Sequence, residues 1–292
     1  MNREFLISYC GNLLTANWYS VSDSGQISTE MTYLMQLRSI KIEIDDLAAS
    51  GAVEMALYRD DGIVLRTWKL GESDRIVVIL TKENGKVRVV AKGVRKTKSK
   101  FGARLEPTSH VSLQLFSGKG ELGIATQAET IDSFQNIRTN PDLFSEASAM
   151  LEVVDYVARD DSPDSIRYKM LLGALRTLDE KKPPLLVPAF FLKLLEHEGL
   201  GPELGYCVKC ANTENLASLS IGEGGVFCKD CQRGRKISSA SLAVMRAILG
   251  GGLNKALEIK DEKIIVEVDR IAHEAMEFHI ERKIRSRRVM DT

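Results

Sequence analysis

Short apolar runs, separated by turn residues, fill the chain between residues 55 and 136. Their length and their β-branched content are typical of strands. Asn84-Gly85 is the strongest turn signal among them, because this pair favours a two-residue hairpin. Five short strands with one long connection between the third and the fourth resemble an OB-fold barrel. We predict these strands over residues 63–67, 75–81, 87–90, 111–115 and 122–128.

From residue 140 onward, apolar residues recur at the spacing of helices instead. Asn140 and Pro141 provide an N-cap and a first-turn residue for the first helix. Together with the strands, this pattern indicates a multidomain α+β protein, with the OB-fold over residues 55–136 and an α-helical domain over residues 140–292. Breakers and apolar spacing predict helices over residues 140–159, 163–179, 187–198, 238–249 and 264–289.

The first 54 residues follow neither pattern. They lack the basic and apolar stretches of a secretion signal, and they are acidic overall. Met55 stands directly before the first apolar run. We hypothesise that translation starts at Met55 and that residues 1–54 are an N-terminal extension of doubtful origin. The alternative is that they form a genuine acidic helical segment.

Charge is distributed unevenly along the chain. The 40 Lys and Arg residues balance the 40 Asp and Glu residues overall, but the formal charge is −4 over residues 1–54, +6 over residues 55–140 and −2 over the remainder. The strongest local excess is within residues 82–104, where nine basic residues accompany one acidic residue. Such a run is either a solvated loop or a track that binds phosphates. Phe101 lies inside the run, where it either stacks on a nucleic-acid base or anchors the loop in the core.

Four of the five cysteines form a pattern that is typical of zinc sites, Cys-x2-Cys-x17-Cys-x2-Cys, within residues 206–232. Thiolates bind Zn²⁺ well, and four of them fill its tetrahedral shell, so we expect one structural ion rather than a hydrolytic centre. An iron–sulfur centre uses the same ligands and is the main alternative. Cys10 has no assigned role. The predicted ligands are Cys207, Cys210, Cys228 and Cys231.

Patterns that indicate catalysis are missing from the sequence. The chain contains no Walker A motif and no His-Glu-x-x-His motif, and its four histidines are scattered. No apolar run reaches the length of roughly 18–20 residues that a membrane helix needs. We therefore assign no catalytic residue and expect neither an enzyme nor a membrane protein.

Several stretches together resemble the RecO family of bacterial recombination mediators. They are Gly62-Ile-Val-Leu-Arg-Thr, Gly71-Glu-Ser-Asp-Arg, Ala91-Lys-Gly-Val-Arg-Lys-Thr-Lys-Ser-Lys-Phe-Gly, Gly120-Glu-Leu-Gly with Gln127-Ala-Glu, Pro188-Ala-Phe-Phe-Leu-Lys-Leu-Leu, the cysteine module and Arg285-Ser-Arg-Arg. They follow the family's order from Met55 to the end of the chain, whereas residues 1–54 have no counterpart.

This resemblance implies an N-terminal OB-fold that binds DNA, followed by a helical domain with a zinc module. It further implies binding of single- and double-stranded DNA, annealing of complementary strands and assistance to RecA in a RecF-type pathway. The implied partners are RecR and single-stranded-DNA-binding protein, in the cytoplasm at the nucleoid. With Phe101 added from the charge pattern, the expected DNA-binding residues are Lys92, Arg95, Lys96, Lys98, Lys100, Phe101 and Arg104.

Two other functions compete with this interpretation. One is a zinc-bearing scaffold that joins proteins and touches DNA incidentally. The other is a metal-dependent nuclease, which the closed shell of four cysteines disfavours. Binding of pure oligonucleotide, without partners, separates the first from a DNA-binding mediator.

Overall fold

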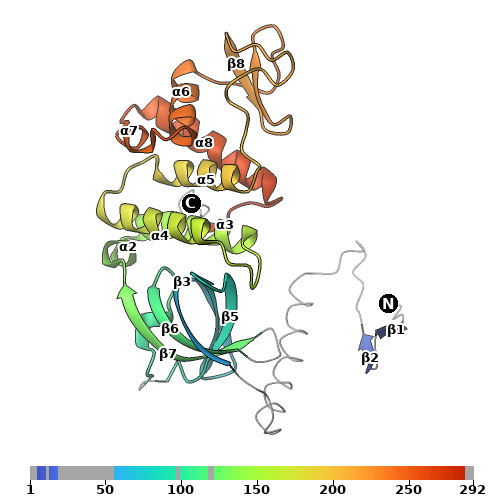
Figure 1. Cartoon of the computed structure of the whole chain (residues 1–292), viewed down its shortest axis with the longest axis vertical. Helices are drawn as coiled ribbons and strands as arrows, with labels where there is room; N and C mark the ends of the chain where they lie inside the picture. The colour runs from blue at the N-terminus through green and yellow to red at the C-terminus, as the bar shows by residue number, and fades with distance from the viewer. Residues whose placement is uncertain (1–4, 11–12, 19–55, 97–98, 118–121, 287–292) are drawn as a thin grey trace. The chain divides into compact units, whose positions relative to one another are not determined.

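A computed structural model describes residues 5–10, 13–18, 56–96, 99–117 and 122–286 (Figure 1). The chain divides into two units, Met1–Glu54 and Met55–Thr292. In the first unit, β1 (Phe5–Cys10) pairs antiparallel with β2 (Leu13–Trp18). The described part of this unit is therefore strand, where the sequence indicated either no regular element or an acidic helix. A translation start at Met55 stays a prediction.

Residues 56–132 form a closed five-stranded barrel, as the strand pattern predicted (Figure 1). The strand order is β3-β4-β5-β7-β6, and β6 pairs with β3 to close the barrel. The pairing of β5 with β7 is parallel and the other pairings are antiparallel. This is the arrangement of an OB-fold. The strands are β3 (Ala56–Leu70), β4 (Asp74–Thr81), β5 (Lys86–Ala91), β6 (His110–Ser117) and β7 (Gly123–Asp132).

Strand β3 is much longer than predicted, because Arg59, Asp60 and Asp61 interrupt the apolar pattern in its first half. Its first half, Ala56–Ile63, pairs with β6, and its second half, Gly62–Leu70, pairs with β4. A Cβ atom on Gly62 would lie 2.4 Å from Cγ2 of Ile79, so only glycine fits where the two pairings overlap. Asp60 is buried, and its carboxylate accepts the backbone N–H groups of Glu83 and Asn84 at the β4–β5 turn.

Most of the helices predicted after residue 140 are present in the structure. Asn140, Asp164, Ser238 and Asp261 each cap a helix by accepting N–H groups of the first turn. The helices are α2 (Gln135–Thr139), α3 (Pro141–Val157), α4 (Ser165–Glu180), α5 (Leu186–His197), α6 (Ser239–Leu249), α7 (Leu253–Leu257) and α8 (Glu262–His279). None of the helices among the described residues is both long enough and apolar enough to cross a membrane.

The last helix ends ten residues earlier than the predicted residue 289, at His279. The chain then folds back onto α3, where Ile284 is buried and the Glu152 carboxylate accepts the N–H groups of Arg285 and Ser286. The basic composition of this stretch suggested a continued helix, but three-dimensional contacts with α3 decide its path. Residues 287–292 lie outside the described residues.

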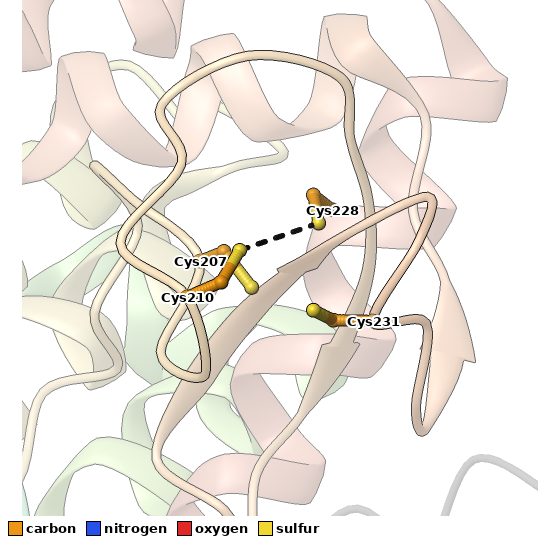
Figure 2. A group of neighbouring side chains, drawn as sticks. All are labelled: Cys207, Cys210, Cys228 and Cys231. Carbon is orange, nitrogen blue, oxygen red and sulfur yellow. Dashed lines mark hydrogen bonds between the residues drawn. The ribbon is translucent and has the colours of Figure 1, made fainter.

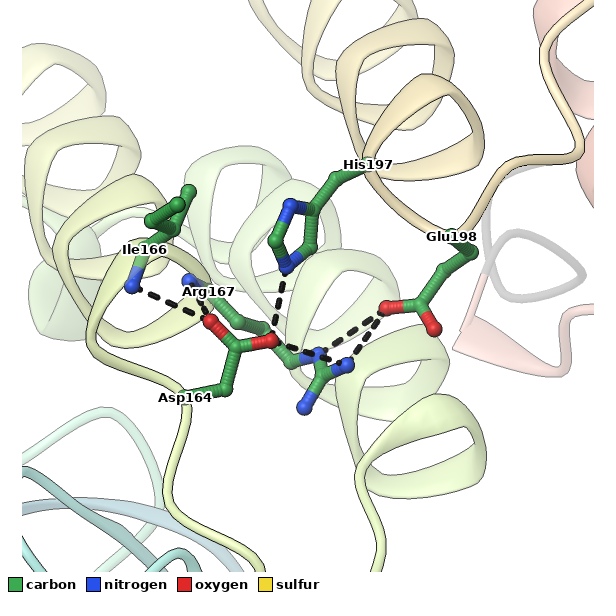
Figure 3. A network of polar contacts seen from close by, with 5 residues as sticks. All are labelled: Asp164, Ile166, Arg167, His197 and Glu198. Atoms are coloured by element: carbon green, nitrogen blue, oxygen red, sulfur yellow. Dashed lines mark hydrogen bonds and ion pairs between the residues drawn. The ribbon is translucent and has the colours of Figure 1, made fainter.

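A polar network ties the start of α4 to the end of α5 (Figure 3). His197 Nε2 lies 2.7 Å from Asp164 Oδ2, and the Arg167 guanidinium donates to Glu198 at 2.6 Å. Burial raises the pKa of Asp164, but hydrogen bonds from the Arg167 N–H and from His197 outweigh it, so this pKa is lowered. The network therefore favours the ionised carboxylate that caps α4.

Two large apolar clusters hold the described barrel and helices together, and a third, smaller one contains Cys207, Phe227 and Cys228. The barrel interior contains Val77, Ile79 and Leu113. The outer face of the barrel, including Val78 and Leu80, packs into the larger cluster with the helices. Strand β4 is thus buried on both faces, which explains its unbroken run of β-branched residues.

Candidate metal centre and nucleic-acid interface

Two tight turns beside a small antiparallel sheet present the four cysteines. The sheet has the order β10-β8-β9 and consists of β8 (Leu216–Ser220), β9 (Gly225–Cys228) and β10 (Arg235–Lys236). In the first turn, the Ala211 N–H donates to the carbonyl of Cys207. In the second turn, the Cys231 N–H donates to the carbonyl of Cys228. These strands are too short and too irregular to be seen in the sequence.

The four sulfur atoms converge on one point (Figure 2). All four Sγ atoms lie within 4.8 Å of one another, and those of Cys210 and Cys228 are 3.7 Å apart. A tetrahedral zinc ion with Zn–S bonds of about 2.3 Å separates its sulfurs by about 3.8 Å. None of the four is in a disulfide. The structure thus brings the four predicted ligands together in a geometry that fits a metal ion.

The thiols of this cluster differ in acidity. Burial raises the pKa of Cys207, but backbone N–H groups, foremost that of Cys228, outweigh it and lower this pKa to about 6. A hydrogen bond with Cys210 is the main cause that raises the pKa of Cys231 to about 12. Sulfurs packed this closely share protons, and a divalent cation that replaces those protons allows them to ionise together.

The basic run divides into two parts with different surroundings. In its first part, Lys82 pairs with Glu83 at 2.9 Å, and Arg88 pairs with Asp160 at 2.7 Å. Lys86 is buried, and its ammonium group donates to the carbonyl of Asp155 at 2.7 Å, with the carboxylates of Asp155 and Asp160 at 3.6 and 3.5 Å. Carboxylates therefore compensate this part, and Lys86 and Arg88 join the barrel to the loop that follows α3.

The second part follows β5 and differs in having exposed cations without carboxylate partners. None of these side chains forms an ion pair with a described residue. Lys98 lies outside the described residues. The exposed cations, called the basic segment below, are Lys92, Arg95, Lys96, Lys100 and Arg104.

The structure places Phe101 in the barrel core. Its side chain has no exposed surface, and it packs with Leu105 inside the barrel, next to the short helix η1 (Gly102–Leu105). The Lys100 ammonium lies 5.2 Å from the centre of its ring. In this conformation a nucleic-acid base cannot reach the ring. Of the two predicted roles, Phe101 therefore has that of a core anchor and not that of a stacking platform.

Comparison with known proteins covers the barrel and the helical part. A family model described as "Recombination protein O N terminal" matches residues 55–134, and one described as "Recombination protein O C terminal" matches residues 138–288. "DNA repair protein RecO" of Streptomyces coelicolor is 40% identical over 248 residues, covering 81% of this chain and 100% of the relative. The proteins of that name from Thermobifida fusca and Bifidobacterium longum are 37% and 36% identical, covering 81% and 82% of this chain and 99% and 100% of the relatives.

Proposed function

Because this chain belongs to the recombination protein O family, we propose that it is a DNA-binding recombination mediator. Family membership supports a role in DNA repair and recombination. In this proposal the protein binds single- and double-stranded DNA, anneals complementary strands and helps to load RecA in a RecF-type pathway. Its partners are RecR and single-stranded-DNA-binding protein, and it works in the cytoplasm on nucleoid DNA.

The observation that carries the DNA-binding proposal is the basic segment itself. Five exposed cations that form no ion pair with a described residue lie on a single connection of an OB barrel. Side chains of this kind neutralise phosphates and release counterions, which supplies affinity without sequence preference. The first part of the basic run does not contribute in this way, because carboxylates already compensate it.

The proposed mechanism needs no bond to be made or broken by the protein. Cations that neutralise the phosphates of one strand lower its repulsion for a second strand, so that base pairing proceeds. No residue is therefore assigned as catalytic.

For the cysteine module we propose one structural zinc ion. The spacing of the sulfurs supports a single ion, because an iron–sulfur cluster inserts several atoms between its thiolates and needs ligands that lie further apart. Four thiolates leave no open position for water, so the ion stabilises the fold and activates no nucleophile. This closed shell also disfavours a nuclease.

The DNA-binding proposal is tested by titrating the full chain with a fluorescent single-stranded oligonucleotide, without partners, over a range of salt concentrations. If Lys98 joins the five described cations, log K falls with a slope of roughly −4 against log salt. In the triple variant Lys92→Ala, Lys96→Ala, Lys100→Ala, the slope becomes less steep by roughly 2, and binding to every sequence weakens alike.

A matched control is Lys255→Ala, Lys260→Ala, Lys263→Ala, which removes three exposed lysines of the helical part. It should leave both the slope and strand annealing unchanged. An affinity that does not depend on salt contradicts the proposal, as does normal annealing by the first triple variant. Absence of oligonucleotide binding would indicate a protein–protein scaffold instead.

A further inference from the structure

The turn between β3 and β4, with the adjoining end of β4, is hydrogen-bonded to the start of the basic segment. The Asp74 carboxylate accepts the backbone N–H of Gly93 at 2.7 Å. The backbone N–H of Arg95 donates to the carbonyl of Ser73 at 2.9 Å, and its guanidinium donates to the carbonyl of Glu72 at 2.8 Å. Three successive residues of the turn thus bind the segment just after it leaves β5.

The same turn also determines how Asp74 is oriented. The Ser73 hydroxyl donates to Asp74 Oδ1 at 2.8 Å, and this oxygen is the one that accepts from Gly93. Gly93 has a φ of +68°, a conformation that favours glycine and turns the chain sharply. The backbone N–H of Lys96 then donates to the carbonyl of Gly93. The path of the segment up to Lys96 is therefore set by Asp74 and by local hydrogen bonds.

The next residue of the turn motif binds the other end of the segment. Arg75 Nη1 lies 2.6 Å from Glu106 Oε1, directly after η1. Phe101 and Leu105 are buried in the barrel just before this ion pair. The segment is thus held at its start by Asp74 and at its end by Arg75, two neighbouring residues of one strand.

We propose that Asp74 is a positioning residue for DNA binding, which holds the basic segment in a path where its cations contact successive phosphates together. Arg75 and Glu106 perform the same task at the far end. This inference rests on the proposed function, since it concerns the same surface. Its physical basis is preorganisation: residues already held by hydrogen bonds, such as Gly93 and Arg95, lose less conformational freedom when DNA binds.

The sign of the effect separates positioning from simple charge. Asp74 is an acidic residue beside a surface proposed to bind a polyanion. If it acted only through its charge, its removal would strengthen DNA binding. If it positions the segment, removal of its carboxylate weakens DNA binding although the net charge becomes more positive. The two roles therefore predict changes in opposite directions.

The experiment measures the affinity of the full chain for a fluorescent oligothymidine by anisotropy, with three variants. Asp74→Ala removes both the acceptor and the charge, and we expect affinity to fall by about five- to tenfold. Asp74→Asn keeps an oxygen acceptor for Gly93 but removes the charge, and we expect affinity at or above that of the unchanged protein. Glu72→Ala is the matched control, because only the backbone carbonyl of Glu72 holds the segment. It should strengthen binding by about twofold.

Thermal unfolding of each variant shows whether the barrel stays folded. An Asp74→Ala protein that melts normally and binds more tightly, like Glu72→Ala, overturns the positioning role. Failure of Asp74→Asn to restore binding overturns it as well. The variant Lys92→Ala, Lys96→Ala, Lys100→Ala serves as the reference for the surface itself. If that variant binds normally, the proposed interface is wrong; if it binds weakly while Asp74→Ala does not, only the positioning role fails.

Discussion

The cysteine module and the basic run of residues 82–104 differ in how much of their geometry is local. Each pair of cysteines lies in one turn, and the turns adjoin a three-stranded sheet that lies within residues 216–236, close to them in the sequence. The basic run, in contrast, takes its surroundings from β4 near Gly93, and from α3 and the loop after α3 at Lys86. The spacing of the cysteines along the chain therefore predicts the metal centre almost completely. A count of charges, in contrast, does not show which cations of the basic run are paired with carboxylates.

Loss of one metal ligand should have the largest effect. Cys228→Ser replaces a buried thiolate, and we expect bound zinc to be lost and the stability of the module to fall by roughly 5 kcal/mol or more. Native mass spectrometry and hydrogen exchange over β8 and β9 measure the two effects. Oligonucleotide binding should persist, because the basic segment belongs to the barrel.

Cys10→Ser is the matched control for that variant, since Cys10 is the one cysteine outside the Cys-x2-Cys pairs. It should retain one zinc ion per chain. Iron in the purified protein, or a full complement of zinc in Cys228→Ser, contradicts the assignment of the metal centre.

A smaller effect tests whether the basic run has two parts. Lys86→Met leaves Arg66 and Arg88 as the cationic partners of Asp155 and Asp160 among the described residues, and we expect a loss of about 2 kcal/mol in the free energy of unfolding. Urea unfolding measures this loss. The salt dependence of DNA binding should not change, because the Lys86 ammonium is already compensated.

Lys92→Met is the partner experiment, because Lys92 is exposed and has no ion pair with a described residue. Its stability should stay within about 0.5 kcal/mol of the unchanged protein, while its affinity for DNA falls. If Lys86→Met weakens DNA binding as strongly as Lys92→Met does, the division of the run is wrong.

The smallest expected effect concerns Asp164, the N-cap residue of α4, which belongs to neither the cysteine module nor the basic run. Folding lowers the pKa of Asp164, so its contribution to stability is fully present above its ordinary pKa of 3.8 and is lost as the pH falls through the lower, folded value. Asp164→Ala should cost about 1 kcal/mol at neutral pH and reduce the acid dependence of unfolding. Urea midpoints at several pH values measure it. A change in zinc content or DNA affinity would mean that the two regions are coupled through α4.

Sequence patterns predicted the parts of the fold that depend on neighbouring residues. The apolar runs gave five strands, the cap Asn140 located one helix start, and the range predicted over residues 238–249 matches α6. Spacing identified Cys207 and its three companions, whose convergence the structure confirms. The family resemblance is confirmed by the matches over residues 55–134 and 138–288.

Features that depend on distant contacts were not predictable. The compensation of Lys86 comes from Asp155 and Asp160, which lie far along the chain. The burial of Phe101 depends on the barrel interior, and the end of α8 depends on the surface of α3. The turn motif beginning at Gly71 was recognised as a family signature, but its hydrogen bonds to the basic segment depend on the pairing of β4 with β5, which brings Asp74 beside Gly93. The available signal for these hydrogen bonds was the presence of Ser73 and Asp74 in a turn next to a strand, because such side chains often bind backbone N–H groups.

The divided pairing of β3 has a consequence for how the chain is made. Ala56 pairs with Ser117, so the first half of this strand emerges from the ribosome well before its partner. At roughly 5–20 residues per second the delay is several seconds, during which one strand edge stays open. Arg59, Asp60 and Asp61 lie along that edge, and charged side chains discourage pairing between nascent chains. The same charged residues that interrupt the apolar pattern of β3 thus discourage its open edge from pairing with another nascent chain until the barrel closes.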